Sequence, residues 1–133
     1  MIYKRNEVFT RVKEDLTNYD NNVNVSSEFV NVPKTMPHVS IEMSDSYTPE
    51  EFETNSSEEE YTVMTFSVNV YSNKSVGKME ECYRLLGVID NAFRKMNFRR
   101  LSLVPVPNLE NASLGRLTAT YQAMADKNGF YRT

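Results

Sequence analysis

The sequence predicts an α+β domain, with two α-helices packed on one face of a mainly antiparallel β-sheet in the order α-β-β-β-α-β-β. Residues 61–72 alternate between apolar and polar side chains, as a strand lying on a core does. Apolar residues recur at helical spacing over about residues 4–18 and 75–96. Further alternating or broken apolar runs occur near residues 23–32, 37–43, 98–107 and 114–125.

The first helix is expected from about Lys4 to Asn18. Its apolar residues lie three or four positions apart and so share one face; they are Phe9, Val12, Leu16 and Tyr19, with Val8 alongside. Residues 20–22 end the helix, because Asp and Asn tolerate left-handed backbone. A short strand with an irregular exit follows, and Pro33 and Pro37 keep the next link extended.

The central pair of strands is expected to be antiparallel. Residues 37–43 turn Val39, Ile41 and Met43 inward, and they pair with residues 61–72. In the longer strand Met64, Phe66, Val68 and Val70 face the core, whereas Thr65, Ser67 and Asn69 face solvent. Twelve residues of strand span roughly 40 Å, which exceeds the size of a compact domain of this length. One end should therefore project from the body or be bent by a bulge.

The second helix is expected from about Ser75, which serves as its N-cap, to Met96. Its apolar stripe consists of Val76, Met79, Tyr83, Leu86, Ile89 or Asp90, and Phe93, widened by Cys82 and Leu85. Asn97 provides a left-handed exit. The next strand runs from Phe98 to the prolines at 105 and 107, which place it at an edge or an end. The last strand, Leu114–Ala125, turns Leu117, Ala119, Tyr121 and Ala123 to one face and is followed by a turn at Asn128–Gly129.

Charge is distributed unevenly along the chain. Eight acids and no base lie between Glu42 and Glu60, although the net charge of the whole chain is only −3. The other residues carry all 15 lysines and arginines but ten acids (18 less eight), a net charge of +5. A long acidic loop, Ser44–Glu60, is therefore expected between the second and third strands, as a functional loop, a disordered segment or simply a solvated face. Its only large apolar residues are Tyr47 and Phe52.

The chain has no recognisable catalytic or cofactor motif. His38 is the only histidine and is expected at the surface or at a sheet edge; Cys82 is the only cysteine and is expected to be a small buried hydrophobe. There is no glycine-rich phosphate loop and no calcium-binding loop pattern. Arg94, Lys95, Arg99 and Arg100 form the only basic cluster, which without regularly spaced aromatic residues is a weak signal for nucleic acid. We therefore expect no enzyme activity, no cofactor and no metal.

Length and hydropathy indicate one domain over residues 1–133. No apolar run approaches the ~20 residues that cross a bilayer, and no signal peptide is evident. The expectation is a soluble protein made in the cytoplasm.

Several phrases, taken in order, resemble the tail terminator (tail completion) proteins of long-tailed bacteriophages. They are residues 37–42 (PHVSIE), residues 61–71 ending in a Val-Tyr-Ser phrase, the helix closing on Met96-Asn97-Phe98, and residues 116–123 (RLTATYQA). Together they cover most of residues 37–125, and the first helix fits by position. Asn97 stands where such proteins often have glycine.

The resemblance implies a non-enzymatic virion protein at the tail–neck junction, assembled in the host cytoplasm. Family members form a hexameric ring that caps the tail tube and offers a docking surface to the head connector. The expected partners are further copies of the chain, the tail tube protein and a head-closure or connector protein. DNA would pass through the lumen without specific binding, and no membrane is involved.

Under this interpretation the acidic loop orders only in the assembly. Tyr47 and Phe52 would anchor it on a neighbouring subunit or on the tube. Its acids would face the lumen or a basic patch of the next copy, such as Arg94, Arg99 and Arg100. The acids concerned are Glu50, Glu51 and Glu53 along the loop and Glu58, Glu59 and Glu60 at its end. The alternatives are another neck component, such as a head-closure or head–tail joining protein, or a small cytoplasmic enzyme or binding domain.

Overall fold

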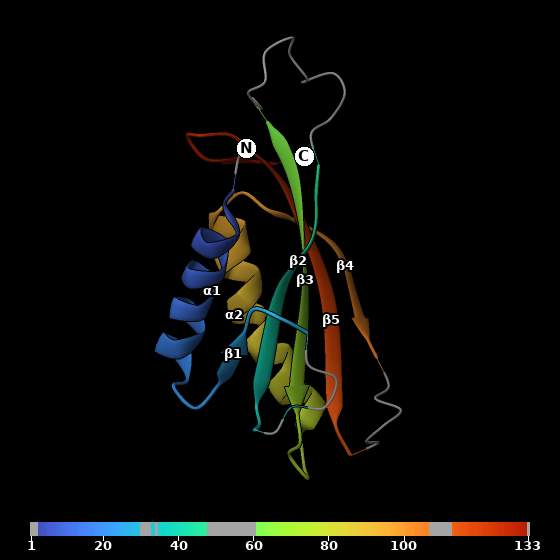
Figure 1. Cartoon of the computed structure of the whole chain (residues 1–133). Coiled ribbons are helices and arrows are strands. Elements are labelled where there is room, and N and C mark those ends of the chain that lie inside the picture. The colour runs from blue at the N-terminus through green and yellow to red at the C-terminus, as the bar shows by residue number, and fades with distance from the viewer. Residues whose placement is uncertain (1–2, 30–32, 34, 48–60, 107–112, 133) are drawn as a thin grey trace.

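The computed structural model describes residues 3–29, 33, 35–47, 61–106 and 113–132. In these residues two helices cover one face of a six-stranded sheet, so the predicted α+β class and element order are confirmed (Figure 1). The elements are α1 (Arg5–Tyr19), β1 (Asn24–Ser26), β2 (His38–Tyr47), β3 (Thr62–Ser72), α2 (Lys78–Lys95), β4 (Arg99–Pro105), β5 (Gly115–Ala125) and β6 (Phe130–Tyr131). The strand order is β1-β2-β3-β5-β4, and β6 pairs with β5.

The sheet is antiparallel except where β1 runs parallel to β2. The predicted pairing of residues 37–43 with residues 61–72 is confirmed, with Ile41 opposite Val68. Strand β2 continues to Tyr47, however, so the prediction that the loop begins at Ser44 is wrong. The cause is backbone pairing with β3, which places Tyr47 opposite Val63 after a register shift between Met43 and Asp45. This end of the β2–β3 pair projects beyond the helices (Figure 1).

The core lies between the sheet and the helices and is centred on aromatic rings. Phe66 on β3 and Tyr121 on β5 are opposite each other in the sheet, and both are buried. Phe93 of α2 stacks on Tyr121 with ring centroids 4.2 Å apart, and Phe98 meets Phe66 edge-on at 5.7 Å. The predicted inward faces of β3 and β5 are therefore confirmed.

The buried faces of both helices differ slightly from the predicted stripes. In α1 the core-facing residues are Val8, Val12 and Leu16, whereas Tyr19 is exposed. In α2 they are Cys82, Leu85, Leu86, Ile89, Ala92 and Phe93. Five of these six residues of α2 belong to the predicted stripe, whereas Ala92 was not predicted and Tyr83 is exposed. Residues that flank a wide apolar face cannot be ordered by spacing alone.

Helix α2 also starts later than predicted. Its N-cap is Gly77, with φ of 79°, and no side chain caps the helix. Ser75 is therefore not the cap, and Val76 is 86% exposed before the helix begins. A left-handed glycine can turn the chain sharply from the end of β3 into the helix, which makes a hydroxyl cap unnecessary. At the other end the predicted left-handed exit is confirmed, since Asn97 has φ of 66°.

The C-terminal part adds a strand that the sequence did not predict. The turn at residues 128–129 is confirmed: the backbone N–H groups of Asn128 and Gly129 donate to Asp126 Oδ1 at 2.7 and 2.9 Å. The turn returns the chain so that β6 pairs with the end of β5, and Phe130 packs on Phe98. Strand β4 lies at an edge of the sheet, as the prolines predicted, and it runs from Arg99 to Pro105 rather than from Phe98 to Pro107.

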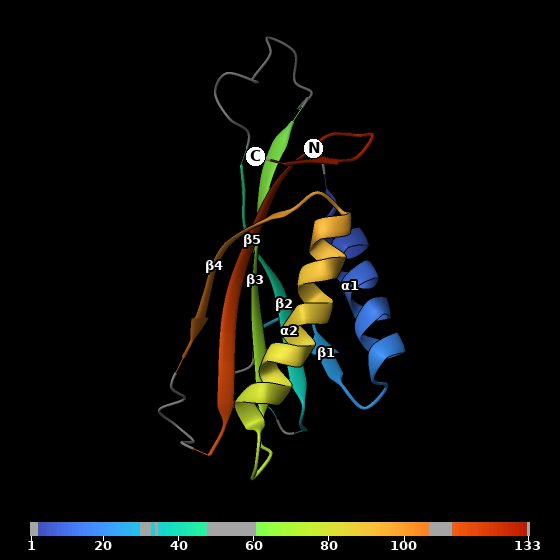
Figure 2. The ribbon, with the colours of Figure 1, turned by 180° about the vertical axis from the view of Figure 1, so that it is seen from behind.

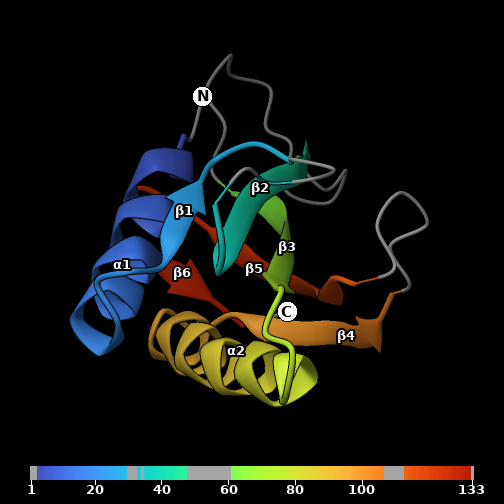
Figure 3. The same cartoon turned by 90° about the horizontal axis from the view of Figure 1, so that it is seen from below.

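The sheet face opposite the helices is less exposed than predicted. The chain that follows β1 crosses in front of β2 and β3 in Figure 1, whereas α2 lies behind them, as the reverse view in Figure 2 shows. Figure 3, seen from below, shows the chain that follows β1 and helix α2 on opposite sides of the sheet. Ser40, Asn69 and Tyr71, on this face of the sheet, are buried. None of the helices in the described part of the chain is both long and apolar enough to span a bilayer.

Candidate assembly surface

His38 is a buried residue, and the prediction that it lies at the surface is wrong. Only 8% of it is exposed, and its Nε2 lies 3.1 Å from Ser26 Oγ on the neighbouring strand β1. Burial lowers the pKa of His38 below its ordinary value of 6.5. Its ring centroid is 6.2 Å from that of Tyr71, which fits a structural position inside the polar face of the sheet.

Cys82 is buried, as predicted. Burial, with a smaller contribution from the nearby Glu81 carboxylate, raises the pKa of the thiol to about 11. Its Sγ lies 3.7 Å from the carbonyl oxygen of Val70. Within residues 3–29, 33, 35–47, 61–106 and 113–132, no group of three or more His, Cys, Asp or Glu side chains could hold a metal ion.

A basic hollow, here called the arginine pocket, lies where the end of α2 meets the start of β4 and the middle of β5. Its volume is about 180 Å³, and it is lined by Asp90, Arg94, Phe98, Arg99, Arg100, Tyr121 and Arg132. The structure thus brings together the three arginines that the sequence analysis assigned to an interface. Lys95, the fourth member of the basic cluster in the sequence, lies on a different surface.

Asp90 organises the arginine pocket. Its Oδ1 accepts hydrogen bonds from Tyr121 OH at 2.9 Å and from Arg100 Nη1 at 3.3 Å, and its Oδ2 accepts one from Arg94 Nη2 at 3.2 Å. Burial, followed by the hydrogen bond to Asp90, raises the pKa of Tyr121 far above its ordinary value, so the phenol remains a donor. Two arginines are thereby held in fixed positions at the rim of the pocket.

The other two arginines have no such partner. Both Arg99 and Arg132 are exposed, and no carboxylate of the described residues lies within 4 Å of either guanidinium. The pocket therefore presents four guanidinium groups against one carboxylate. An arrangement of this kind favours a ligand that carries carboxylate or phosphate groups.

The projecting end of β2 and β3 forms a second feature of the surface. Tyr47 is 49% exposed at its tip. The backbone there is fixed, because Thr62 Oγ1 donates to the carbonyl oxygen of Tyr47 at 3.1 Å and lies 3.1 Å from Ser46 Oγ. The other predicted interface residues of the loop lie outside the described residues: Glu50, Glu51, Phe52, Glu53, Glu58, Glu59 and Glu60.

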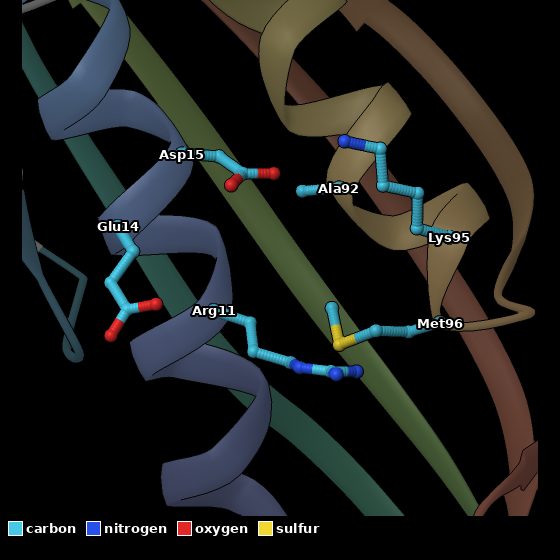
Figure 4. Close-up of a pocket in the computed structure, with 6 residues that line it drawn as sticks. All are labelled: Arg11, Glu14, Asp15, Ala92, Lys95 and Met96. Atoms are coloured by element: carbon cyan, nitrogen blue, oxygen red, sulfur yellow. The ribbon is translucent and has the colours of Figure 1, made fainter.

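Another hollow, of about 230 Å³, lies between the two helices (Figure 4). Arg11, Glu14 and Asp15 of α1 line one side, and Ala92, Lys95 and Met96 of α2 line the other. Two acids and two bases balance there, so the hollow selects no charge class of ligand.

A polar cluster on the opposite face of the sheet fastens the crossing segment. Asn69 Oδ1 accepts three hydrogen bonds, from Arg116 Nε at 3.1 Å, Arg116 Nη2 at 2.8 Å and Thr118 Oγ1 at 2.8 Å. The Arg116 guanidinium lies 5.2 Å from the ring centroid of Phe29 and 5.6 Å from that of Tyr71. Because these groups bond to one another, we assign the cluster to the stability of the fold.

Three polar or charged residues of the arginine pocket, Asp90, Tyr121 and Arg132, were not predicted from the sequence. Asp90 was considered only as a position in the helical stripe, and Tyr121 only as a core residue. The available signals were the Asp90–Arg94 spacing of four residues and the cost of a carboxylate on an apolar helix face, which requires a partner. Arg132 gave no local signal, since its place depends on the pairing of β6 with β5.

Comparison with known proteins found similarity among solved structures alone. No protein-family model matches the sequence, and neither does any curated protein. Among solved structures, the chain is similar to one described as "Structure of bacteriophage SPP1 gp17 protein", with 21% identity, 88% of each chain covered and a TM-score of 0.45. Because the identity is below 25% and the TM-score is below 0.5, we base no functional argument on this likeness.

Proposed function

We propose that this chain is a structural protein of a bacteriophage tail, in which a hexameric ring of copies ends the tail tube and offers a docking surface to the head or neck connector. The proposal needs no catalytic group and no cofactor. It places the protein in the virion at the tail–neck junction.

One observation carries the proposal. The phrases that resemble tail terminator proteins lie on β2, β3, the end of α2 and β5, and these elements form one packed unit. Strand β3 pairs with both β2 and β5, and Met96 and Phe98 from the helix end are buried in the same core. An agreement between four short phrases and a single contiguous structural unit is what a shared architecture would produce.

The surface of the molecule supports a ring rather than a two-fold dimer. The arginine pocket lies beside α2 and β4, whereas the acidic sequence of residues 48–60 leaves from the end of β2 and returns to β3. Complementary charges that occur on different parts of one chain favour head-to-tail contacts, and such contacts close into rings when the rotation permits. In this proposal Tyr47 and Phe52 anchor the loop on the next subunit or on the tube.

The test compares two isolated partners, tail tubes and portal complexes, in a co-sedimentation experiment with the purified protein. A tail terminator is expected to sediment with the tubes and to be seen at one tube end in negative-stain images. Binding to portal complexes but not to tubes would instead identify a head-closure or head–tail joining protein. Binding to neither would contradict the proposal.

A further inference from the structure

The arginine pocket carries more positive charge than its own described neighbours neutralise. Asp90 is already occupied by Tyr121, Arg94 and Arg100, and its side chain is only 16% exposed. Arg99 and Arg132 stand at the same hollow with no carboxylate of the described residues within 4 Å. Four guanidinium groups this close repel one another, so a bound anionic group would stabilise the pocket.

The size of the pocket restricts the class of ligand. A hollow of about 180 Å³ is smaller than the roughly 300–1,000 Å³ that sites for small organic ligands usually occupy. It can admit one or two side chains that lie at the end of a longer segment. Carboxylates match the planar donor pattern of arginine, and the guanidinium groups of Arg94 and Arg100 are already oriented by their bonds to Asp90.

We propose that the arginine pocket binds glutamate side chains from residues 48–60 of a second copy of this chain. That sequence contains six glutamates and no base, the charge complement of the pocket. This inference rests on the proposed ring, because in a head-to-tail ring each copy presents its pocket to one neighbour and its acidic segment to the other.

The pocket and the strand ends that flank the acidic segment belong to different parts of the sheet. Arg100 is opposite Tyr121 on β5, and Tyr121 is opposite Phe66 on β3. Phe66 lies four residues after Thr62, where β3 starts at the projecting end, a distance of about 13 Å along the strand. The acidic segment follows the end of β2 and precedes the start of β3, and β5 separates those strands from β4. The proposed ring assigns the segment to a neighbouring copy, and the second experiment below tests this assignment against binding within the same chain.

The first experiment measures carboxylate recognition without requiring a ring. A fluorescein-labelled peptide with the sequence of residues 48–60 is titrated with the full-length protein at low salt, and anisotropy gives the dissociation constant. Arg99→Glu with Arg132→Glu should weaken binding at least about tenfold. These two arginines are chosen because neither takes part in the bonds to Asp90.

A matched control carries the same change of charge elsewhere. Arg11→Glu with Arg84→Glu alters two exposed arginines on α1 and α2 and should leave the dissociation constant within about twofold. Equal weakening by both pairs would contradict the proposal, because it would indicate general attraction rather than a site. Absence of peptide binding to the unmodified protein, or tighter binding of a short DNA duplex that displaces the peptide, would also contradict it.

The second experiment distinguishes a second copy from the same chain. One variant carries Arg99→Glu and Arg132→Glu, and the other carries Glu58→Lys, Glu59→Lys and Glu60→Lys. Each alone should fail to form rings on isolated tail tubes, whereas an equimolar mixture should form them, since every interface in an alternating ring is then complementary. Rings from either variant alone would overturn the inference. The inference would also be overturned if the equimolar mixture formed no rings while a single chain that carries all five changes did form them. That result would indicate that the acidic segment binds the pocket of its own chain. In either outcome, ring formation by the unmodified protein would leave the proposed function standing.

Discussion

Phe66 tests the core at the level of a single residue. It is fully buried on β3, with its ring centroid 6.0 Å from that of Phe93 and 5.7 Å from that of Phe98. Phe66→Ala should lower the free energy of unfolding by about 3–5 kcal/mol, because it leaves a cavity between the sheet and α2. Chemical denaturation measures the loss. The exposed Tyr83→Ala serves as the control, and an unchanged midpoint for Phe66→Ala would show that the strand face is wrongly assigned.

His38 predicts a dependence of stability on pH. Because its pKa is lowered in the folded state, the unfolded chain takes up a proton more readily, so stability should fall as the pH drops below about 6.5 and level off below the folded pKa. Denaturation midpoints at about pH 7.5 and about pH 5.5 measure this fall. His38→Gln should make the fall smaller. A fall of equal size in both proteins would assign the effect to other groups.

Residue-scale features differ in how well the sequence predicts them. Cys82 and Phe66 were predicted to be buried because apolar side chains at regular spacing identify the core. His38 was predicted at the surface or at a sheet edge because no local pattern indicates that β1 pairs with β2 and brings Ser26 against the imidazole. The burial of Tyr121 was predicted, but its hydrogen bond to Asp90 was not, because the two residues meet only when α2 packs on β5.

At the scale of elements, the exit from α2 depends on Asn97. Its backbone is left-handed, and its Nδ2 donates to the carbonyl oxygen of Phe130 at 3.0 Å. Asn97→Ala should cost about 1–2 kcal/mol of stability from the left-handed backbone, together with the lost hydrogen bond. Asn97→Gly loses only the hydrogen bond and should retain more stability. Equal losses in thermal or chemical denaturation would contradict this account of the helix end.

The projecting end of β2 and β3 gives a prediction about assembly rather than about stability. Tyr47 is half exposed and contributes little to the core, so Tyr47→Ala combined with Phe52→Ala should leave the free energy of unfolding nearly unchanged. In the proposed assembly these aromatic side chains anchor the loop, so the same variant should no longer cap tail tubes. Capping is scored by electron microscopy of tubes, with Tyr83→Ala as the control. A variant that caps normally would show that the segment is only a connection.

Most elements could be predicted because their apolar residues follow a period of two or 3.6. The errors occur where periodicity is not the deciding factor. The polar sequence of residues 44–47 predicts a loop, but backbone pairing with β3 extends the strand to Tyr47. Helix α2 starts at Lys78 because a left-handed glycine turns the chain there, and β6 forms because Asp126 closes the preceding turn.

At the scale of the whole molecule, the arginine pocket could be predicted only in part. Arg94, Arg99 and Arg100 are close in sequence, and their clustering was noted. Asp90, Tyr121 and Arg132 join them through the packing of α2 on β5 and through the pairing of β6 with β5. Contacts between residues far apart in the chain leave no local pattern in a single sequence.

The central claim, that copies of this chain form a ring at the end of a tail tube, is tested most directly by the copy number and symmetry of tube-bound protein. Tubes saturated with the purified protein are imaged end-on, and the mass added at one end is measured. The proposal predicts a closed ring of six copies related by rotation about the tube axis. A two-fold dimer at the tube end, or protein distributed along the tube wall, would contradict it.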